Sequence, residues 1–383
     1  MMWEIARLGD ISKNIQTGPF GSQLHQSDYS ECGIPVVMPK DLVGGKISGE
    51  SIARVDKTHV ERLCRHKIEV GDILYSRRGD VGRCAHVTKK EEGWLCGTGC
   101  LRVTVDSEKA DSRFVFFQLQ HPDTVGWVEK HAVGATMLNL NTTILSSVPI
   151  RLPALEIQKR IADILSAYDD LIENNQKQIK LLEEATQRLY KEWFVNLRFP
   201  GHENTKIVDG VPEGWSRTNI NEILTFHRGY DLTRNEMKAG RYPVVGSTTV
   251  IGYHNEFKIK GPGIVTGRSG SLGKYQFIWD NFWPHNTSLY ISDYKDHNIF
   301  FVYSLLQTVD FASLNNGGAI PTLNRNVLSN IEVIEPTDEL QEMFAKIAEP
   351  QYQKIKNLEK QNNQLKMARD ALLPKLMSGE VEV

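Results

Sequence analysis

The later part of this sequence occurs twice, and this duplication limits the folds that the chain can adopt. A shift of 183 residues, without a gap, aligns Leu140-Asn141 with Leu323-Asn324 and Leu145-Ser146 with Leu328-Ser329. The same shift aligns Pro153 with Pro336, Gln158 with Gln341, Ala162 with Ala345, Leu182 with Leu365, Ala185 with Ala368 and Leu189 with Leu372. Such a repeat predicts a pseudo-symmetric molecule with two sites of one kind.

Each copy has the same order, a globule of short strands and loops followed by one long helix. The openings Trp3–Ile11 and Trp215–Ile223 match at a shift of 212 residues. Because the shift has fallen to 183 at Leu140, the second globule is shorter by about 29 residues. We therefore predict an α+β fold with two pseudo-symmetric globules separated by a long antiparallel two-helix coiled coil.

The expected elements follow from turn residues and apolar runs. Strands are expected at Ile34–Met38, Asp72–Ser76, Leu101–Val105, Gly263–Thr266 and Ser288–Ile291, and short helices at Arg113–Gln120 and Asn298–Gln307. The predicted boundaries are 1–152 for globule one, 153–198 for the central helix, 199–214 for a linker, 215–335 for globule two, 336–378 for the distal helix and 379–383 for a tail.

Both long helices show heptad spacing. From Ile157 to Leu189, a mostly apolar seam steps by four and three with the polar residues Asn175 and Gln178 in its middle, and a similar seam runs from Leu340 to Leu372, as in helices that pack together. One such helix alone could lie on its own globule, whereas two matched seams favour antiparallel packing against each other. Pro350 is expected to kink or break the distal helix, and Pro374 to end it.

Composition excludes several classes of protein. The 383 residues are 40% hydrophobic and 24% charged, and no apolar run approaches the ~18 residues of a membrane helix. The first residues do not form a signal peptide, so we expect a cytoplasmic location without membrane association. The cysteines at 32, 64, 84, 96 and 100 are odd in number, which argues against a disulfide framework. Cys96-Gly-Thr-Gly-Cys100 could form half of a zinc site, but buried reduced thiols are favoured.

No catalytic signature is present. The segment from Gly267 to Lys274 resembles a phosphate-binding loop, but two features do not fit. Gly267 lies one position too far from Gly273, and Tyr275 stands where Ser or Thr is required. The catalytic loop of an amino-methyltransferase is also missing. The sequence predicts a protein that is not an enzyme and that binds no metal or cofactor of its own.

A repeated loop is more informative. The segments Arg77–Arg83 and Arg268–Lys274 each follow an expected strand, and both fit Arg-x-Gly-x-x-Gly-(Arg/Lys). Glycines permit a close approach of the backbone, and the cations suit phosphates or guanine edges. Although the net charge is −2, residues 62–90 hold eight Lys or Arg and three acids, which is compatible with DNA binding. A hairpin turn with solvated cations explains the pattern equally well.

Further polar loops follow the first strand or precede the last strand of each globule. Ser, Thr, Asn and backbone amides in such loops can contact phosphates or bases, although simple turn chemistry explains each loop taken singly. The candidate DNA-binding residues are Thr17, Phe20, Ser22, Lys40, Ser76, Arg77, Arg78, Arg83, Thr136 and Asn139 in copy one, and Arg228, Tyr230, Ser247, Thr248, Arg268, Ser269, Ser271, Lys274, His285, Asn286 and Thr322 in copy two.

Over essentially its whole length, the chain resembles the specificity (S) subunit of a type I restriction-modification enzyme. The resemblance is carried by Val211-Pro-Glu-Gly-Trp215, Gly71-Asp-Ile-Leu-Tyr-Ser-Arg-Arg-Gly79, Gly318-Ala-Ile-Pro-Thr-Leu-Asn324 and Leu152-Pro-Ala-Leu-Glu-Ile-Gln-Lys-Arg-Ile161. It implies that each globule is a target recognition domain for one half of a split sequence in double-stranded DNA. It also implies a helix pair that spaces the two domains.

The resemblance further implies that the helices dock two methyltransferase (M) subunits, through which motor-nuclease (R) subunits join. S-adenosylmethionine, ATP and Mg would then be used by these partners. The candidate docking residues are Ile161, Ile164, Tyr168, Leu171, Leu182, Phe344, Ile347, Leu358 and Leu365. A coiled-coil adaptor whose globules bind protein instead of DNA is the alternative, and a free-standing hydrolase is a more remote one.

Overall fold

The computed structural model describes residues 3–134, 138–268, 273–309 and 331–383. The chain forms two compact units. Unit 1 comprises Met1–Asn174 with Gln361–Val383, and unit 2 comprises Asn175–Lys360. The boundaries predicted from the sequence divide the chain at helix ends, whereas these units divide it within both long helices.

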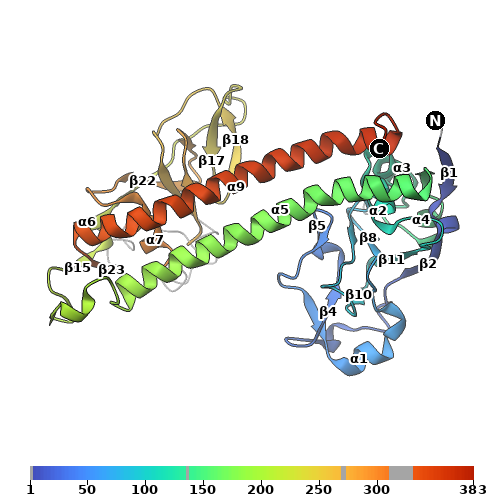
Figure 1. Ribbon diagram of the computed structural model, residues 1–383, viewed down its shortest axis with the longest axis horizontal. Coiled ribbons are helices and arrows are strands. Elements are labelled where there is room, and N and C mark those ends of the chain that lie inside the picture. Colours follow the sequence, from blue (N-terminus) through green and yellow to red (C-terminus); the bar gives the residue numbers. More distant parts are fainter. Residues whose placement is uncertain (1–2, 135–137, 269–272, 310–330) are drawn as a thin grey trace. The chain divides into compact units, whose positions relative to one another are not determined.

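Unit 1 contains short strands, short helices and parts of both long helices (Figure 1). Its strands are β1 (Glu4–Arg7), β2 (Ser12–Thr17), β3 (Tyr29–Ser30), β4 (Ile34–Val37), β5 (Leu42–Val43), β6 (Lys46–Ile47), β7 (Ala53–Val55), β8 (Ile73–Ser76), β9 (Cys84–His86), β10 (Leu95–Cys96), β11 (Cys100–Val105) and β12 (Pro149–Leu152). Its short helices are α1 (Lys57–Arg62), α2 (Ser112–Gln120), α3 (Pro122–His131) and α4 (Thr142–Ser146).

Unit 2 has a similar content. Its strands are β13 (Ile207–Val208), β14 (Val211–Pro212), β15 (Ser216–Asn219), β16 (Thr225–Arg228), β17 (Tyr242–Val245), β18 (Val250–His254), β19 (Gly263–Gly267), β20 (Tyr275–Ile278), β21 (Trp283–Pro284), β22 (Ser288–Asp293) and β23 (Glu332–Glu335). Its short helices are α6 (Ile220–Ile223) and α7 (Ile299–Leu306), and the long helices are α5 (Leu155–Tyr190) and α9 (Asp338–Ser378). All strands and short helices expected above are present, with ends within one residue of those predicted, except that β22 extends two residues beyond Ile291. Asn298, at the predicted start of α7, is its N-cap.

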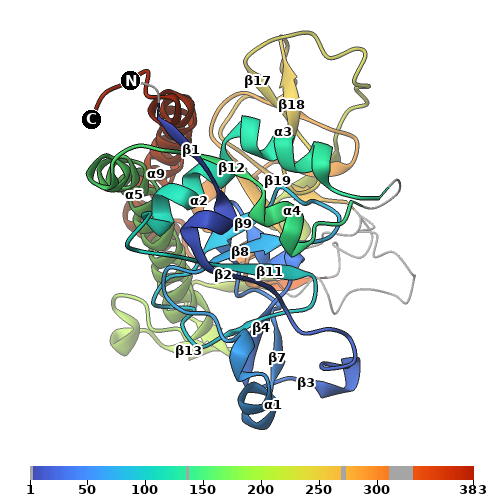
Figure 2. The ribbon, with the colours of Figure 1, turned by 90° about the vertical axis from the view of Figure 1, so that its right-hand side faces the viewer.

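The two units share one sheet topology. The main sheet has the order β2-β11-β8-β9 in unit 1 and β16-β22-β19-β20 in unit 2, and Figure 2 shows the former face-on. A second sheet pairs β4 in parallel with β10, as β17 pairs with β21. A third pairing joins the first and last strands of each globule, β1 with β12 and β15 with β23. The duplication seen in the sequence is therefore a duplication of fold.

The repeated Gln and Pro residues have the same structural role in both copies. The Gln158 side-chain amide is buried and donates to the Pro153 carbonyl at 2.9 Å. In the second copy, buried Gln341 donates to the Pro336 carbonyl at 3.1 Å. Each glutamine thus satisfies a carbonyl of the chain entering a long helix, where an unpaired buried group would be costly.

Within each unit, α5 and α9 pack antiparallel. In unit 1, Ile161 and Met377 lie in one apolar core, and Arg369 forms an ion pair with Asp169. In unit 2, Thr186 Oγ1 donates to Gln351 at 2.7 Å, and the rings of Tyr190 and Phe344 are 5.7 Å apart. The predicted antiparallel pairing is present in both units, while the predicted coiled coil remains an expectation.

Helix α9 continues through Pro350 and ends beyond Pro374. The predicted break at Pro350 and the predicted end at Pro374 were therefore wrong, whereas a kink at Pro350 stays a prediction. The carbonyls that lose a donor, those of Lys346 and Asp370, belong to exposed residues, where water can replace the lost hydrogen bond. The helix ends instead at Gly379, whose φ of +76° permits a left-handed cap.

Other segments also refine the prediction. The predicted linker 199–214 contains the β13–β14 hairpin, and Phe199 is buried with its ring 4.9 Å from that of Trp215. Cys84, Cys96 and Cys100 are buried as expected, but Cys32 and Cys64 are exposed. No helix in the described ranges has an apolar stretch long enough to traverse a lipid bilayer.

Candidate nucleic-acid interface

In unit 1, the predicted loops meet at one end of the main sheet. Thr17 at the end of β2 pairs with Leu101, and Ser76 at the end of β8 pairs with Cys100. The loops that follow β2 and β8 therefore lie beside the loop that precedes β11. Thr98 in that third loop donates its hydroxyl to the Pro19 carbonyl at 2.8 Å.

The equivalent end of the unit 2 sheet is built in the same way. The Gly18 amide donates to the Cys100 carbonyl at 2.9 Å, and the Gly229 amide donates to the Ser288 carbonyl at 3.0 Å. A Cβ on Gly18 would lie 1.9 Å from the Gly97 carbonyl oxygen, and one on Gly229 would lie 2.1 Å from that of His285. Both positions therefore require glycine, since the crossing backbones leave no space for a side chain.

Arg77 and Arg268 occupy matching places at these two sheet ends. The Arg77 amide donates to the Gly99 carbonyl at 2.8 Å, and the Arg268 amide donates to the Thr287 carbonyl at 3.1 Å. In unit 1 the loop is also held from its other side, because the Leu140 amide donates to the Arg77 carbonyl at 2.8 Å. Arg77 and Arg268, the first residues of the two repeated segments, therefore share one backbone setting.

Two polar atoms at the unit 1 sheet end are buried without a hydrogen-bond partner among the described residues. They are Arg77 Nε and Asn139 Oδ1. Arg78 and Asn139 face each other across an isolated β-bridge, so these side chains belong to one cluster. A buried polar atom without a partner costs roughly 1–3 kcal/mol, and such sites often serve a ligand.

The cations of this cluster differ in how they are neutralised. Arg83 Nε donates to an Asp80 carboxylate oxygen at 2.6 Å. In the described part of the chain, no carboxylate forms an ion pair with Arg77 or with exposed Arg78. Of the three arginines, Arg77 and Arg78 therefore retain a positive charge that can attract an anion.

In unit 2, the same backbone arrangement at the sheet end is surrounded by different side chains. The His285 ring contacts Thr287 Oγ1 at 3.0 Å and the Leu232 carbonyl at 3.2 Å. Asp231 accepts from Asn286 and from Arg228, the latter at 3.3 Å. Ser247 Oγ donates to the Thr287 carbonyl at 2.8 Å, and Tyr230 OH lies 2.9 Å from Tyr290 OH.

The remaining candidate residues are less uniform. Phe20, Ser22, Thr248 and Lys274 are exposed on loops, and Lys40 is exposed on a 3-10 helix, Pro39–Asp41. Ser76 is a correction, because it is buried and its hydroxyl donates to the Arg78 carbonyl at 3.1 Å. It supports the loop and does not face a ligand. Thr136, Ser269, Ser271 and Thr322 lie outside the described residues.

Sequence reasoning missed the residues that hold these loops in place. Asp231 engages two of the proposed contact residues, and Thr98 fastens the loop after β2. The signal for Thr98 was present in Cys96-Gly-Thr-Gly-Cys100, which was considered as half of a zinc site. Burial raises the pKa of Cys96 to about 12. The described residues contain no group of three His, Cys, Asp or Glu side chains that could hold a metal ion.

Comparison with known proteins identifies the family. A family model described as "Type I restriction modification DNA specificity domain" matches residues 2–184 and 212–367. This chain belongs to that family. The two matched segments correspond to the two copies of the repeat, and the family identity assigns the chain to DNA recognition within type I restriction-modification systems.

Relatives match over the full length. The MjaIX specificity subunit of Methanocaldococcus jannaschii is 25% identical over all of this chain and 94% of its own length. The HindI specificity subunit of Haemophilus influenzae is 20% identical, with 99% of each chain covered. The crystal structure of a type I restriction-modification S subunit from M. genitalium has the same fold, with a TM-score of 0.63, 19% identity, and coverage of 98% of this chain and 96% of that one.

In this specificity-domain protein, the helix residues predicted to dock partners are only partly accessible. Ile161, Phe344 and Leu358 are buried, which corrects the prediction that they contact a partner. Ile164, Tyr168, Leu182 and Leu365 are half-buried. Leu171 and Ile347 are 52% and 43% exposed. Heptad counting did not select Leu181, Met343 and Met367, which are also exposed.

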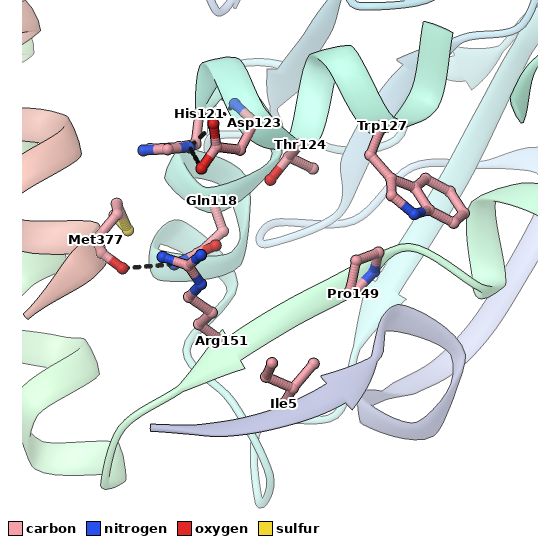
Figure 3. A pocket seen from close by; sticks show the side chains of 9 residues that line it. All are labelled: Ile5, Gln118, His121, Asp123, Thr124, Trp127, Pro149, Arg151 and Met377. Carbon is pink, nitrogen blue, oxygen red and sulfur yellow. Dashed lines mark hydrogen bonds and ion pairs between the residues drawn. The ribbon is translucent and has the colours of Figure 1, made fainter. Parts of the chain in front are cut away.

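A small cavity in unit 1 is separate from the sheet-end loops. It has a volume of about 200 Å³ and lies between α3, the β1–β12 pair and the end of α9 (Figure 3). Gln118 at its wall donates to the Met377 carbonyl at 3.4 Å, and His121 Nδ1 accepts from the Asp123 amide at 3.2 Å. Burial lowers the pKa of His121. No predicted DNA-binding residue lines this cavity.

Proposed function

We propose that this chain is the non-catalytic subunit that reads a bipartite sequence in double-stranded DNA, with one half-site for each globule. One observation carries the proposal. Arg77 and Arg268 project from the same backbone setting at equivalent sheet ends, and the side chains around them differ. Because the backbone around the two arginines is the same, both globules would bind DNA in the same way. Because the surrounding side chains differ, each globule would recognise a different sequence.

The chemistry of the loops supports this role. An arginine can donate two hydrogen bonds to guanine O6 and N7, and an asparagine can pair with adenine. Arg77 and Asn139 in unit 1 supply such groups, with buried polar atoms that lack partners. Exposed Arg78, Lys40 and Lys274 suit phosphate contacts, which fix the position of the protein without reading sequence.

The helices would carry the partner subunits. We propose that exposed apolar residues of α5 and α9, including Leu171 and Ile347, dock two methyltransferase subunits, through which motor-nuclease subunits join. S-adenosylmethionine, ATP and Mg would be bound by those partners. Methylation of adenine N6 and ATP-driven cleavage would be partner activities directed to the site that this chain selects. These partner activities place the proposed complex in the cytoplasm.

The methylation pattern in a host tests the proposal. The chain is expressed with its methyltransferase subunit, and N6-methyladenine is mapped across the genome. We expect one bipartite motif. Arg77→Ala should relax only one half of that motif and Arg268→Ala only the other, each with a discrimination loss of about 1–3 kcal/mol. A single contiguous motif, or no methylation with an active partner, would refute the proposal.

A further inference from the structure

Unit 2 contains a groove whose counterpart in unit 1 is largely filled. The groove has a volume of about 870 Å³, and the matching cavity in unit 1 about 270 Å³. The two cavities are equivalent because the strand registers match. In unit 2, Thr266 of β19 pairs with the lining residue Tyr275, and in unit 1, Tyr75 of β8 pairs with the lining residue Cys84. The other equivalent lining residues are Gly273 and Gly82, Gln307 and Gln120, and Tyr352 and Asp169.

An insertion in unit 1 explains the difference in volume. Strand β4 is followed by residues 38–52, which include the β5–β6 hairpin, before the chain forms β7. In unit 2, only residues 246–249 separate β17 from β18. The hairpin residues Leu42 and Ile47 are buried with Leu74 and Ala85 of the main sheet. The hairpin therefore covers the sheet edge that unit 2 leaves open.

The tip of this hairpin shows what the space accommodates. The backbone at Gly45 lies so close to α2 that a Cβ there would be 2.7 Å from Gln120 Nε2. Next to it, Lys46 Nζ donates to Glu173 of α5 at 2.5 Å. In unit 1, the equivalent space thus holds an extended segment with a lysine that pairs with a helix carboxylate.

The open groove of unit 2 has the features needed to bind a similar segment. Strand β20 forms its wall and is an edge strand, which pairs within the described sheet only with β19. Aromatic side chains line it, with the Phe277 ring 5.2 Å from that of Tyr303 and 6.0 Å from that of Tyr352. An edge strand offers unpaired backbone groups to a further strand, and aromatic faces attract cations.

Two carboxylates complete the groove. Glu183 of α5 and Glu359 of α9 both line it, as does Lys274, which directly precedes β20, and in the described part of the chain neither carboxylate forms an ion pair with a cation. Partial burial raises the pKa of the Glu359 carboxyl, and neighbouring Glu183 adds to this effect. A lysine or arginine placed between the two carboxylates would relieve their repulsion.

We propose that this groove receives an extended segment of the methyltransferase subunit that carries a lysine or arginine. The segment would take the place that the β5–β6 hairpin and Lys46 take in unit 1. The inference rests on the proposed function, because that function supplies the partner. It adds that the two methyltransferase subunits are held by unequal contacts, since among the described residues the groove is open in unit 2 and largely filled in unit 1.

The carboxylates provide the first test. The double variant Glu183→Gln/Glu359→Gln is compared with Glu184→Gln/Glu349→Gln, which removes the same charge from the same helices outside the groove. Binding of the methyltransferase subunit to the purified full chain is measured by titration and native mass spectrometry. The groove variant should weaken binding of one of the two subunits by about tenfold to a hundredfold, and the control by less than about twofold. Equal behaviour of the two variants would overturn the proposal.

Cross-linking provides a second test that does not depend on the variants' stability. A photoreactive amino acid replaces Thr248, which lines the groove and is exposed. In the assembled complex, cross-links should form to a methyltransferase peptide with a lysine or arginine. Cross-links confined to this chain or to DNA would overturn the proposal. Protection from hydrogen exchange, in the chain alone, of the β20 amides that do not pair with β19 would also overturn it.

The methylated motif separates the two proposals. If the methylated motif is bipartite and the groove variants still bind both methyltransferase subunits normally, only the groove proposal is overturned. The absence of a bipartite motif would overturn the proposed function itself.

Discussion

Gln158→Ala is expected to destabilise unit 1 strongly. The Gln158 side chain is 1% exposed and bridges two parts of the backbone. Its Nε2 donates to the Pro153 carbonyl at 2.9 Å, and its Oε1 accepts from the Asp111 amide at 3.0 Å. Asp111 caps α2, so this one side chain joins the start of α5 to the start of α2.

The magnitude follows from the two groups left unpaired. The Pro153 carbonyl is buried, and loss of its donor should cost about 1–3 kcal/mol. Asp111 is only half-buried, so water can partly hydrate its amide and the cost there should be near 1 kcal/mol. We therefore expect Gln158→Ala to lower the free energy of unfolding by about 2–4 kcal/mol.

Chemical denaturation followed by circular dichroism measures this loss, and hydrogen exchange of the α2 amides locates it. Gln341→Ala is the matched variant in unit 2, where the side-chain amide donates to the Pro336 carbonyl, and it should cost about 1–3 kcal/mol. Gln364→Ala, at an exposed position of α9, should change stability by less than about 0.5 kcal/mol. A loss below about 1 kcal/mol for Gln158→Ala would refute the reasoning.

Three further predictions concern charge and burial. Arg78→Ala should weaken binding to duplex DNA of any sequence and reduce the slope of log K against log salt by about 0.9. A salt series measures this, and an unchanged slope would contradict a phosphate contact. Exposed Cys32 and Cys64 should react rapidly with a thiol reagent, whereas buried Cys96, with its pKa raised to about 12, should react only on unfolding. Rapid modification of Cys96 in the folded protein would be the contrary result. Burial lowers the pKa of His86 to about 4 from 6.5. The folded state therefore binds fewer protons, and stability should fall as the pH drops from 6.5 toward 4. Denaturation at stepped pH checks this, and a His86→Gln variant with the same pH dependence would contradict it.

The sequence predicted the repeat, the strands and the antiparallel helices because these depend on local patterns. The pairing of Gln158 with Gln341 in the alignment corresponds to two matching hydrogen bonds. The end of α9 was not predictable from Pro374. Helix continuation there depends on Leu376 and Met377, which are buried in the unit 1 core, and no local pattern reports that packing.

The candidate site shows the same division. Glycine spacing and the repeated arginines predicted a matched pair of loops, and the structure places Arg77 and Arg268 at equivalent sheet ends. The burial of Ser76 and the role of Asp231 depend on contacts between segments far apart in the sequence. Likewise, the fall in the alignment shift from 212 to 183 residues showed that the second globule is shorter. That the missing segment is the β5–β6 hairpin could be seen only from the order of strands.

The pairing of β1 with β12 and of β15 with β23 has a consequence for how such proteins can change. In each globule, the chain enters and leaves through two adjacent antiparallel strands, Glu4 opposite Leu152 and Ser216 opposite Glu335. The residues between these strands form the globule, and the long helices follow after them in the chain. Genetic recombination at the two strand pairs would thus exchange one globule, and with it the proposed half-site, in one step, with the long helices retained.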